Sequence, residues 1–236
     1  MGAQYLLSAD AHICVLRASV VLLDLSSGKY LSMSPEQSSA AGAYVKGWPC
    51  QSFDDGEGNG AGEGVLQTLL QRRLITADSS RGKVASPVQV VMPTAWIGEF
   101  RPRGWPRIDM QHIARFARTV LATSIRLRTM KMQSIIRRVS RRKAANADSR
   151  RLTVAEQAEL VRVFDWLRPL AFHKRDTCLL YTLSLLEFLA CYGVFPDWIF
   201  GVSVAPFKAH CWLQEGELLL TDTPFKTGAL TPIMVV

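Results

Sequence analysis

Cysteine is scarce in this chain, and its spacing argues against both disulfides and a zinc site. The 236 residues include five cysteines, an odd number, and no two of them form a CxxC pair. Sparse thiols without such pairing are typical of proteins that stay in a reducing compartment, so we expect a cytoplasmic location.

Long apolar runs are also lacking. The longest extends over residues 178–192, which is 15 residues and includes Glu187, whereas a helix needs about 20 apolar residues to cross a bilayer. Residues 1–10 have no basic stretch ahead of an apolar core, so no secretory signal is expected. These absences predict a globular protein without stable membrane insertion.

Acidic residues are nearly absent from one segment, residues 101–151. This segment holds 15 Lys and Arg but only Asp109 and Asp148, a net charge of +13. The rest of the chain has 13 basic and 18 acidic residues, so the overall charge of +8 is local in origin. Such a segment is compatible with nucleic-acid binding, with docking of a partner, with transient membrane contact, or with a solvated helical face. Because few aromatic residues are interleaved with the arginines, we favour the solvated face and expect no nucleic-acid partner.

The N-terminal part of the chain has the pattern of a small separate module. Three β-rich runs fill residues 11–34, and the second and third are joined by the turn SSGK, in which Gly28 supplies a positive φ. Ser34 is then expected to start a helix as its N-cap, with Pro35 at the first helical position and Gln37 completing a capping box.

A glycine-rich acidic loop and a second helix are expected to complete this module. Glycine recurs at every second position over 56–64, within a segment 54–64 that favours a flexible loop. The apolar residues of 64–75 predict a helix. Three strands followed by two helices resemble a winged-helix-like fold, which we assign to residues 1–82.

A proline-containing linker, residues 83–108, is expected to separate this module from a helical region. Residues 109–143 are predicted to form one helix, because their apolar residues fall on one stripe among the arginines. The stripe consists of Ile113, Phe116, Val120, Leu127, Ile135 and Val139. Another helix is expected over residues 153–167, with Thr153 as its cap and Glu156 as the capping partner.

The C-terminal part is predicted to contain one apolar helix followed by a small sheet. The helix is expected to run from about Thr177 to Tyr192, with Asp176 or Thr177 as its cap and Gly193 at its end. Strands are expected over residues 197–204, 209–214 and 218–222. The fold class is therefore α+β, with residues 109–236 as a second domain.

Cys178 is the first candidate for chemistry. It lies in the first turn of the apolar helix, where free N–H groups and the positive end of the helix dipole favour a thiolate and would also stabilise an oxyanion. A cysteine in an apolar helix can equally be a core residue, which is how we interpret Cys191 at the far end of the same helix.

His210 and Asp222 are the second and third candidates. Strand alternation puts His210 and Trp212 on one face and Cys211 on the other, so Cys211 is given no chemical role. A buried histidine needs a partner for its second ring nitrogen. Asp222 is that partner if residues 215–217 form a three-residue hairpin loop, whereas a two-residue turn would turn the carboxylate away. We therefore predict the three-residue loop.

The order of these three residues along the chain is informative. A cysteine at a helix N-terminus, followed by a histidine and an aspartate on later strands, is the order used by papain-like and transglutaminase-like enzymes. A metal site built from Cys178, Cys191, His210 and Cys211 is disfavoured, because neighbouring strand residues point to opposite faces and the spacing lacks CxxC or HxxxH. Three polar residues with unrelated structural roles are the remaining alternative.

Two segments resemble a known family. DTCLLYTLSLLEFLACYGVFPDWIFGVSVAPFKAHCWLQEGELLLTD, residues 176–222, is similar to the C-terminal half of lasso-peptide maturation B proteins. The matching positions are Cys178, Leu179, Gly193, Gly201, Val202, Pro206, Phe207, His210, Trp212 and Asp222. VVLLDLSSGKYLSMSPEQSSAAGAYV, residues 20–45, independently resembles the leader-recognition module, which is similar to the small peptide-binding protein of pyrroloquinoline quinone biosynthesis. Fusion of the two parts in this order is one form that the family takes.

The resemblance implies a cysteine protease that cuts the leader from a ribosomally made precursor peptide. Cys178 would attack the carbonyl at the leader–core junction, His210 would act as base and then as acid, and Asp222 would orient the imidazole. A separate asparagine-synthetase-like, ATP-dependent cyclase would then close the macrolactam. The resemblance implies no metal and no cofactor in this protein.

The same resemblance implies that the leader adds as a strand to the sheet edge near Tyr30–Ser34, beside the helix predicted over 64–75. The expected leader-binding residues are Tyr30, Leu31, Ser32, Met33, Leu66, Leu69, Leu70 and Leu74. Modules of this type usually have three helices, whereas the glycine run at 56–64 occupies the place of one here. Two other functions fit parts of the sequence: a non-catalytic adaptor that delivers the precursor to the cyclase, and a winged-helix nucleic-acid-binding protein.

Overall fold

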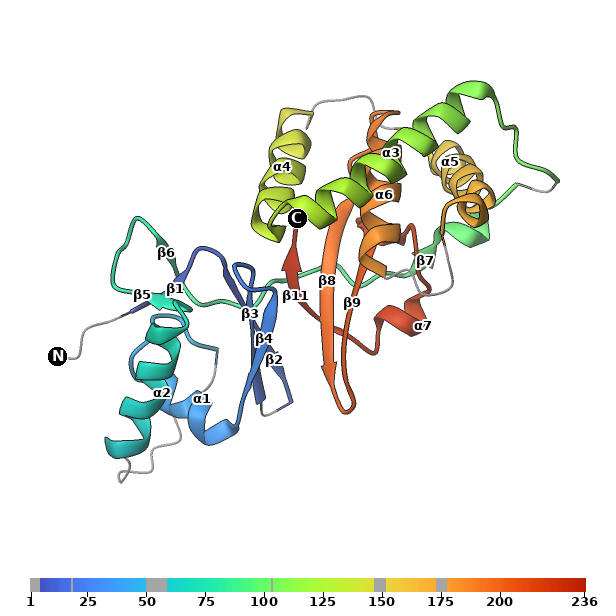
Figure 1. The fold of residues 1–236 in the computed structure, drawn as a ribbon. Helices are drawn as coiled ribbons and strands as arrows, with labels where there is room; N and C mark the ends of the chain where they lie inside the picture. The colour runs from blue at the N-terminus through green and yellow to red at the C-terminus, as the bar shows by residue number, and fades with distance from the viewer. Residues whose placement is uncertain (1–4, 18, 50–58, 103, 147–151, 173–177) are drawn as a thin grey trace. The chain divides into compact units, whose positions relative to one another are not determined.

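The structure, a computed structural model, describes residues 5–17, 19–49, 59–102, 104–146, 152–172 and 178–236 (Figure 1). The chain divides into two compact units. The first consists of residues 1–89, 203–207 and 231–234, and the second consists of residues 90–202, 208–230 and 235–236. Within the described ranges, no helix combines the length and the apolar character that a membrane crossing requires.

A three-stranded antiparallel sheet forms the centre of the first unit. Its strands are β2 (Ala11–Leu16), β3 (Ser19–Asp24) and β4 (Lys29–Met33), in the order β2-β3-β4. The predicted strands are confirmed, and Gly28 in the turn between β3 and β4 has a φ of +67°. Every residue of Val20–Leu23 is buried, so the branched side chains of β3 are covered on both faces of the sheet.

Helix α1 (Pro35–Gly42) begins where the sequence predicts. The Ser34 side chain accepts a hydrogen bond from the main-chain N–H of Gln37, and the Gln37 side chain accepts one from the main-chain N–H of Ser34. This capping box satisfies two N–H groups that the first turn leaves without partners.

Helix α2 (Asn59–Gln71) begins and ends earlier than the predicted range 64–75. Residues 59–64, predicted as loop, are already helical, and the remainder of that loop lies outside the described residues. Packing of Leu69, which is 1% exposed, outweighs the low helix propensity of the glycines. The helix ends where the main-chain N–H of Leu74 bonds to Leu69 O and Arg73 adopts a φ of +56°. No glycine marks this left-handed stop, so the sequence pattern did not reveal it.

A second three-stranded sheet completes the first unit, in the order β5-β1-β6. Its strands are β1 (Leu6–Ser8), β5 (Ile75–Thr76) and β6 (Gly82–Lys83). The buried cluster of this unit joins both sheets to α1 and α2 and contains Leu7, Ala11, Ile13, Val20, Leu22, Met33, Ala41, Val45, Trp48, Leu69, Leu74, Ile75 and Ala85. A winged-helix-like arrangement of these elements stays a prediction.

A five-stranded sheet, in the order β11-β8-β9-β10-β7, combines four strands from the C-terminal part of the chain with β7. Its strands are β7 (Ala95–Trp96), β8 (Asp197–Val204), β9 (Phe207–Glu215), β10 (Leu218–Leu219) and β11 (Thr231–Val235). β8 spans its predicted range, whereas β9 is longer and β10 shorter than predicted. Trp198 and Val236 exchange both main-chain hydrogen bonds, at 3.1 and 3.0 Å, which is the pattern of an antiparallel pair.

Helices cover this sheet, and α6 lies over β8 and β9 (Figure 1). The helical elements are η1 (Ile97–Phe100), α3 (Met110–Thr129), α4 (Met132–Ala145), α5 (Val154–Leu167), η2 (Arg168–Leu170), α6 (Cys178–Ala190) and α7 (Pro224–Thr227). A capping box between Thr153 and Glu156 opens α5, as the sequence predicts.

The single helix predicted over 109–143 is wrong, because the structure contains two helices there. α3 and α4 are separated by Met130 and Lys131, which are extended with ψ of 148° and 146°. No proline or glycine marks this break. The reversal buries Ile135 and Val139 of α4, which are 2% and 4% exposed, so tertiary packing decides where the first helix stops.

Two arginines of the basic segment have an internal role. The Glu187 side chain on α6 is 8% exposed, and its carboxylate pairs with Arg126 of α3 at 3.2 Å and with Arg142 of α4 at 2.7 Å. The network connects three helices and neutralises a carboxylate that burial would otherwise make costly. Two of the arginines of residues 101–151 therefore form ion pairs within the domain.

Candidate active site

Cys178 is the first residue of α6 and is half-buried. N–H groups of the first helical turn and the positive end of the dipole favour negative charge on its sulfur. The predicted caps, Asp176 and Thr177, lie outside the described residues. At the far end of the helix, Sγ of Cys191 donates to the main-chain O of Glu187 at 3.3 Å, which gives that thiol a structural partner.

His210 lies on β9, and Asp222 lies in a bend after β10. Nε2 of His210 is 3.0 Å from Oδ2 of Asp222, and the two side chains are 17% and 8% exposed. The His210 ring stacks with the Trp212 ring at a centroid distance of 6.5 Å. The two rings therefore share one face of the strand, as alternation predicts.

The three-residue hairpin loop predicted over 215–217 is wrong. Glu215 pairs with Leu218, so only Gly216 and Glu217 form the turn. Gly216 has a φ of +56°, a conformation that glycine adopts at little cost and that matches the twist of the strands.

The contact between His210 and Asp222 arises in another way than the prediction assumed. The observed register does not place Asp222 opposite His210. Strand β10 ends at Leu219, one further main-chain hydrogen bond joins Leu220 N–H to Leu213 O at 2.9 Å, and a bend over residues 220–222 directs the carboxylate to the imidazole. The prediction assumed that strand pairing sets the two side chains opposite each other. In the structure a bend after β10 brings them together instead.

Two further groups hold the Asp222 carboxylate. Nζ of Lys226 donates to Oδ1, and Oγ1 of Thr221 donates to Oδ2 at 3.2 Å. Burial alone would raise the pKa of Asp222, but hydrogen bonds from His210 and Lys226 outweigh it and lower that pKa below its usual value. The carboxylate therefore stays ionised and fixes the orientation of the imidazole.

Cys178 and His210 have complementary pKa shifts. The hydrogen bond from the Cys211 thiol lowers the pKa of Cys178 to about 4, with burial opposing and a hydrogen bond from His210 assisting. Hydrogen bonds with Asp222 and then with Cys178 raise the pKa of His210 to about 9. Between these two values the sulfur is a thiolate and the ring is an imidazolium. This charge state provides a nucleophile beside a proton donor.

Cys211 packs on the face of β9 opposite to His210, as the sequence predicts, and is 2% exposed. Alternation itself holds, because Cys211 faces α6, where its Sγ is 3.2 Å from Oγ1 of Thr182. Cys211 is nevertheless the largest influence that lowers the pKa of Cys178, ahead of His210.

A cavity of about 370 Å³ opens at these residues. It is lined by Asp165, Arg168, Cys178, Tyr181, Thr182, His210, Thr221, Asp222 and Lys226. The Tyr181 hydroxyl donates to Asp165 at 2.8 Å, and the Arg168 guanidinium lies 4.5 Å from the centre of the Tyr181 ring. Sequence analysis missed this polar wall, because its residues come from α5, η2 and α6 without a shared motif.

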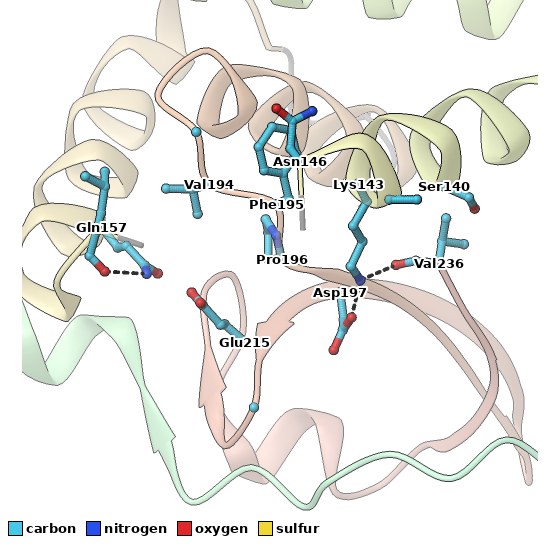
Figure 2. Close-up of a pocket in the computed structure, with 14 residues that line it drawn as sticks. Ser140, Lys143, Asn146, Gln157, Val194, Phe195, Pro196, Asp197, Glu215 and Val236 are labelled. Atoms are coloured by element: carbon cyan, nitrogen blue, oxygen red, sulfur yellow. Dashed lines mark hydrogen bonds and ion pairs between the residues drawn. The ribbon is translucent and has the colours of Figure 1, made fainter. Parts of the chain in front are cut away.

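A separate cavity of about 550 Å³ lies at the other end of α6 (Figure 2). Lys143 forms an ion pair with Asp197 and donates to the main-chain O of Val236 at its wall. Gln157 and Glu215 lie on the opposite side of the opening in Figure 2. None of the three candidate catalytic residues lines this cavity, so it is not the candidate active site.

The residues predicted to bind a leader lie on β4 and α2 of the first unit, except Leu74, which lies between α2 and β5. In the described part of the chain, β4 pairs only with β3 and is an edge strand. Leu31, Met33 and Leu69 line a groove of about 330 Å³ beside α2, together with Val65 and Thr68.

The remaining predicted leader-binding residues do not line this groove. Tyr30 and Leu74 line a neighbouring hollow of about 330 Å³. Ser32 and Leu70 are exposed, and Leu66 is half-buried against the core. The groove therefore includes three of the predicted residues and adds positions from α2 and from α1, where Glu36, Gln37 and Ala40 line it.

The fold and the site define a class of protein. A mixed α/β domain that brings together a cysteine at a helix N-terminus, a strand histidine and a later aspartate is the arrangement of thiol-dependent acyl-transfer enzymes. The chain belongs to the transglutaminase-like superfamily, whose family model matches residues 117–235. Domains of this superfamily are often cysteine proteases or transferases. No curated protein and no solved structure matches the chain significantly.

Proposed function

We propose that this protein is a cysteine peptidase that removes the leader from the precursor of a lasso peptide. The observation that carries the proposal is that Cys178, His210 and Asp222 line one cavity, in which Nε2 of His210 is 3.0 Å from Oδ2 of Asp222. The resemblance of residues 176–222 to lasso-peptide maturation B proteins supports the choice of substrate.

The proposed reaction uses the charge state of the site. The thiolate of Cys178 attacks the carbonyl carbon at the leader–core junction, and the leader becomes a thioester of the enzyme. The imidazolium of His210 protonates the amine of the core as it leaves, and the neutral ring then takes a proton from the water that hydrolyses the thioester. Asp222 keeps the ring oriented throughout, and N–H groups at the start of α6 stabilise the oxyanion.

The first unit is proposed to hold the leader. The edge strand β4 would offer main-chain groups for an added strand, and the groove beside it would accept apolar side chains at Leu31, Met33 and Leu69. Main-chain pairing would supply affinity, and the groove would select the leader sequence. In this scheme an asparagine-synthetase-like, ATP-dependent cyclase receives the freed core amine.

A cleavage assay on the full chain tests this function. The substrate is a synthetic precursor peptide, taken from a short reading frame next to an asparagine-synthetase-like gene beside the gene for this chain. Mass spectrometry should find one cut that yields an intact leader and an intact core. Cys178→Ala should abolish the cut while leaving precursor binding by fluorescence anisotropy unchanged, and Cys191→Ala should leave both unchanged.

The adaptor function makes the opposite forecast for the unaltered chain. An adaptor would bind the precursor but release no leader, with or without the cyclase and ATP. Cleavage that persists in Cys178→Ala would contradict the proposed chemistry, because no other thiol takes the place of Cys178 at the start of α6.

A further inference from the structure

Two carboxylates from the described residues line the candidate active-site cavity, and both already have cationic partners. Asp165 forms an ion pair with Arg101. Asp222 pairs with His210 at 3.0 Å and with Lys226. The charge of each carboxylate is therefore balanced before any further cation of the cavity wall is counted.

Arg168 is such a further cation, and the structure fixes its position. Its main-chain N–H donates to Phe164 O at the end of α5. Its guanidinium carbon lies 4.5 Å from the centre of the Tyr181 ring, a cation–π contact. Among the residues that the structure describes, no acidic side chain forms an ion pair with Arg168. A guanidinium that stacks through its face keeps its N–H edge available, and this edge matches the two oxygens of a carboxylate.

We propose that Arg168 binds a carboxylate of the substrate and thereby makes the peptidase select an Asp or Glu side chain close to the scissile bond. This selection rests on the proposed function, whereas the anion site requires only that Arg168 and Cys178 line the same cavity. A bound carboxylate would balance the cation that the described acidic residues leave unpaired. Because the Arg168 side chain is exposed, solvent and salt reduce the attraction.

Alkylation of Cys178 by two reagents of different charge tests the anion site without any peptide substrate. Iodoacetate carries a carboxylate and iodoacetamide does not. The ratio of their rates on the full chain therefore measures the attraction of an anion and cancels changes in the thiolate itself. Peptide mapping by mass spectrometry separates Cys178 from the other cysteines. In Arg168→Gln the ratio of the iodoacetate rate to the iodoacetamide rate should fall by about three- to tenfold at low salt.

Arg115→Gln is the matched control. The Arg115 guanidinium also stacks on a tyrosine ring, that of Tyr192 at 4.4 Å, but Arg115 does not line the cavity. This variant should leave the ratio unchanged, and Arg168→Lys, which retains the charge, should keep most of it. Circular dichroism verifies that each variant is folded. The proposal is overturned if Arg168→Gln leaves the ratio in place, or if Arg115→Gln lowers it equally.

Precursor peptides with an amidated C-terminus test the selection of an acidic side chain. Replacing the Asp or Glu nearest to the cut by its amide should lower kcat/KM of the unaltered chain by about three- to tenfold. The same replacement should cause no further loss in Arg168→Gln. An effect that is confined to peptides with a free C-terminus would assign the site to a terminal carboxylate and overturn the selection, as would a precursor without an acidic residue near the cut.

The two assays separate this proposal from the peptidase function. If the precursor is not cut but the alkylation ratio falls in Arg168→Gln, the proposed function and the selection fail and the anion site stands. If cleavage requires Cys178 while the amide peptide is cut equally slowly by the unaltered chain and by Arg168→Gln, relative to the acidic peptide, the function stands and the role of Arg168 fails.

Discussion

Nε2 of His210 lies 3.0 Å from Oδ2 of Asp222, although the strand register does not set these residues opposite each other. The carboxylate reaches the ring because the chain bends away from β9 over residues 220–222, after the hydrogen bond from Leu220 N–H to Leu213 O. Lys226 holds the second carboxylate oxygen, so the acid is anchored from two sides. The charge of His210, and with it that of Cys178, therefore depends on a bend rather than on a strand.

Replacing Asp222 by asparagine should keep the shape of the site but remove the charge that stabilises the imidazolium. We expect the pKa of His210 to fall from about 9 toward its ordinary value of about 6.5. The value of kcat should fall by ~10²- to 10⁴-fold, as for other acids that orient a catalytic histidine. Steady-state kinetics on the precursor and NMR titration of His210 measure the two effects.

Lys226→Gln is the matched control, because it alters the same carboxylate from its other side. Lys226 lowers the pKa of His210 through its charge, so its removal should raise that pKa slightly. Turnover should change by less than about tenfold. An equal loss of kcat in both variants would mean that Asp222 acts through the local structure and not through its charge on the ring.

The pH dependence of kcat/KM should be bell-shaped. The acid limb falls near pH 4, where the Cys178 thiolate takes up a proton, and the alkaline limb falls near pH 9, where His210 loses the proton that it gives to the leaving amine. In His210→Ala the alkaline limb should vanish, and the acid limb should move to higher pH because Cys178 loses a cationic partner. A profile that keeps the alkaline limb in this variant would assign that limb to another group.

Glu187→Gln should destabilise the C-terminal domain without changing its chemistry. The substitution leaves Arg126 and Arg142 without their counter-charge among three packed helices. Breaking a fully buried pair costs about 3–5 kcal/mol, and the partial exposure of both arginines reduces our expectation to about 1–3 kcal/mol. Urea unfolding followed by circular dichroism measures this loss.

A surface ion pair in the same domain provides the comparison. Asp197 pairs with Lys143, and its side chain is 43% exposed. Asp197→Asn should therefore change the free energy of unfolding by only about 0–1 kcal/mol. If Glu187→Gln is no more destabilising than Asp197→Asn, the buried network does not hold the helices together.

Neighbouring exposed positions on α2 allow a test of the leader groove. Thr68 lines the groove, whereas Gln67 is also exposed but does not line it. A carboxylate in the groove would oppose apolar docking, so Thr68→Glu should weaken precursor binding by about tenfold or more, and Gln67→Glu should not. Fluorescence anisotropy with a labelled precursor measures affinity, and the alkylation rate of Cys178 should be the same in both variants. If both substitutions weaken precursor binding equally, the leader does not bind in this groove.

The elements that the sequence predicts well are those whose limits are set by near neighbours along the chain. The capping boxes at Ser34 and Thr153, the turn glycine Gly28 and the strand Asp197–Val204 all depend on local stereochemistry and side-chain pattern. The break between α3 and α4 instead serves the burial of Ile135. Burial of a side chain by distant parts of the chain leaves no pattern among neighbouring residues in the sequence.

The candidate site shows the same division. The residue types and their order were sufficient to select Cys178, His210 and Asp222, which the structure brings together; their catalytic role stays a prediction. The predicted turn length was wrong, because strand pairing was assumed to extend to Asp222, where the chain bends.

The most direct test of the central claim is to trap the intermediate on the enzyme. The full chain is mixed with the precursor peptide, quenched in acid within seconds and digested, and the peptide that carries Cys178 is weighed by mass spectrometry. The account predicts that this peptide gains the mass of the leader as a thioester, and that the adduct is absent from Cys178→Ala. Leader release without an adduct on Cys178, or an adduct on another residue, would contradict it.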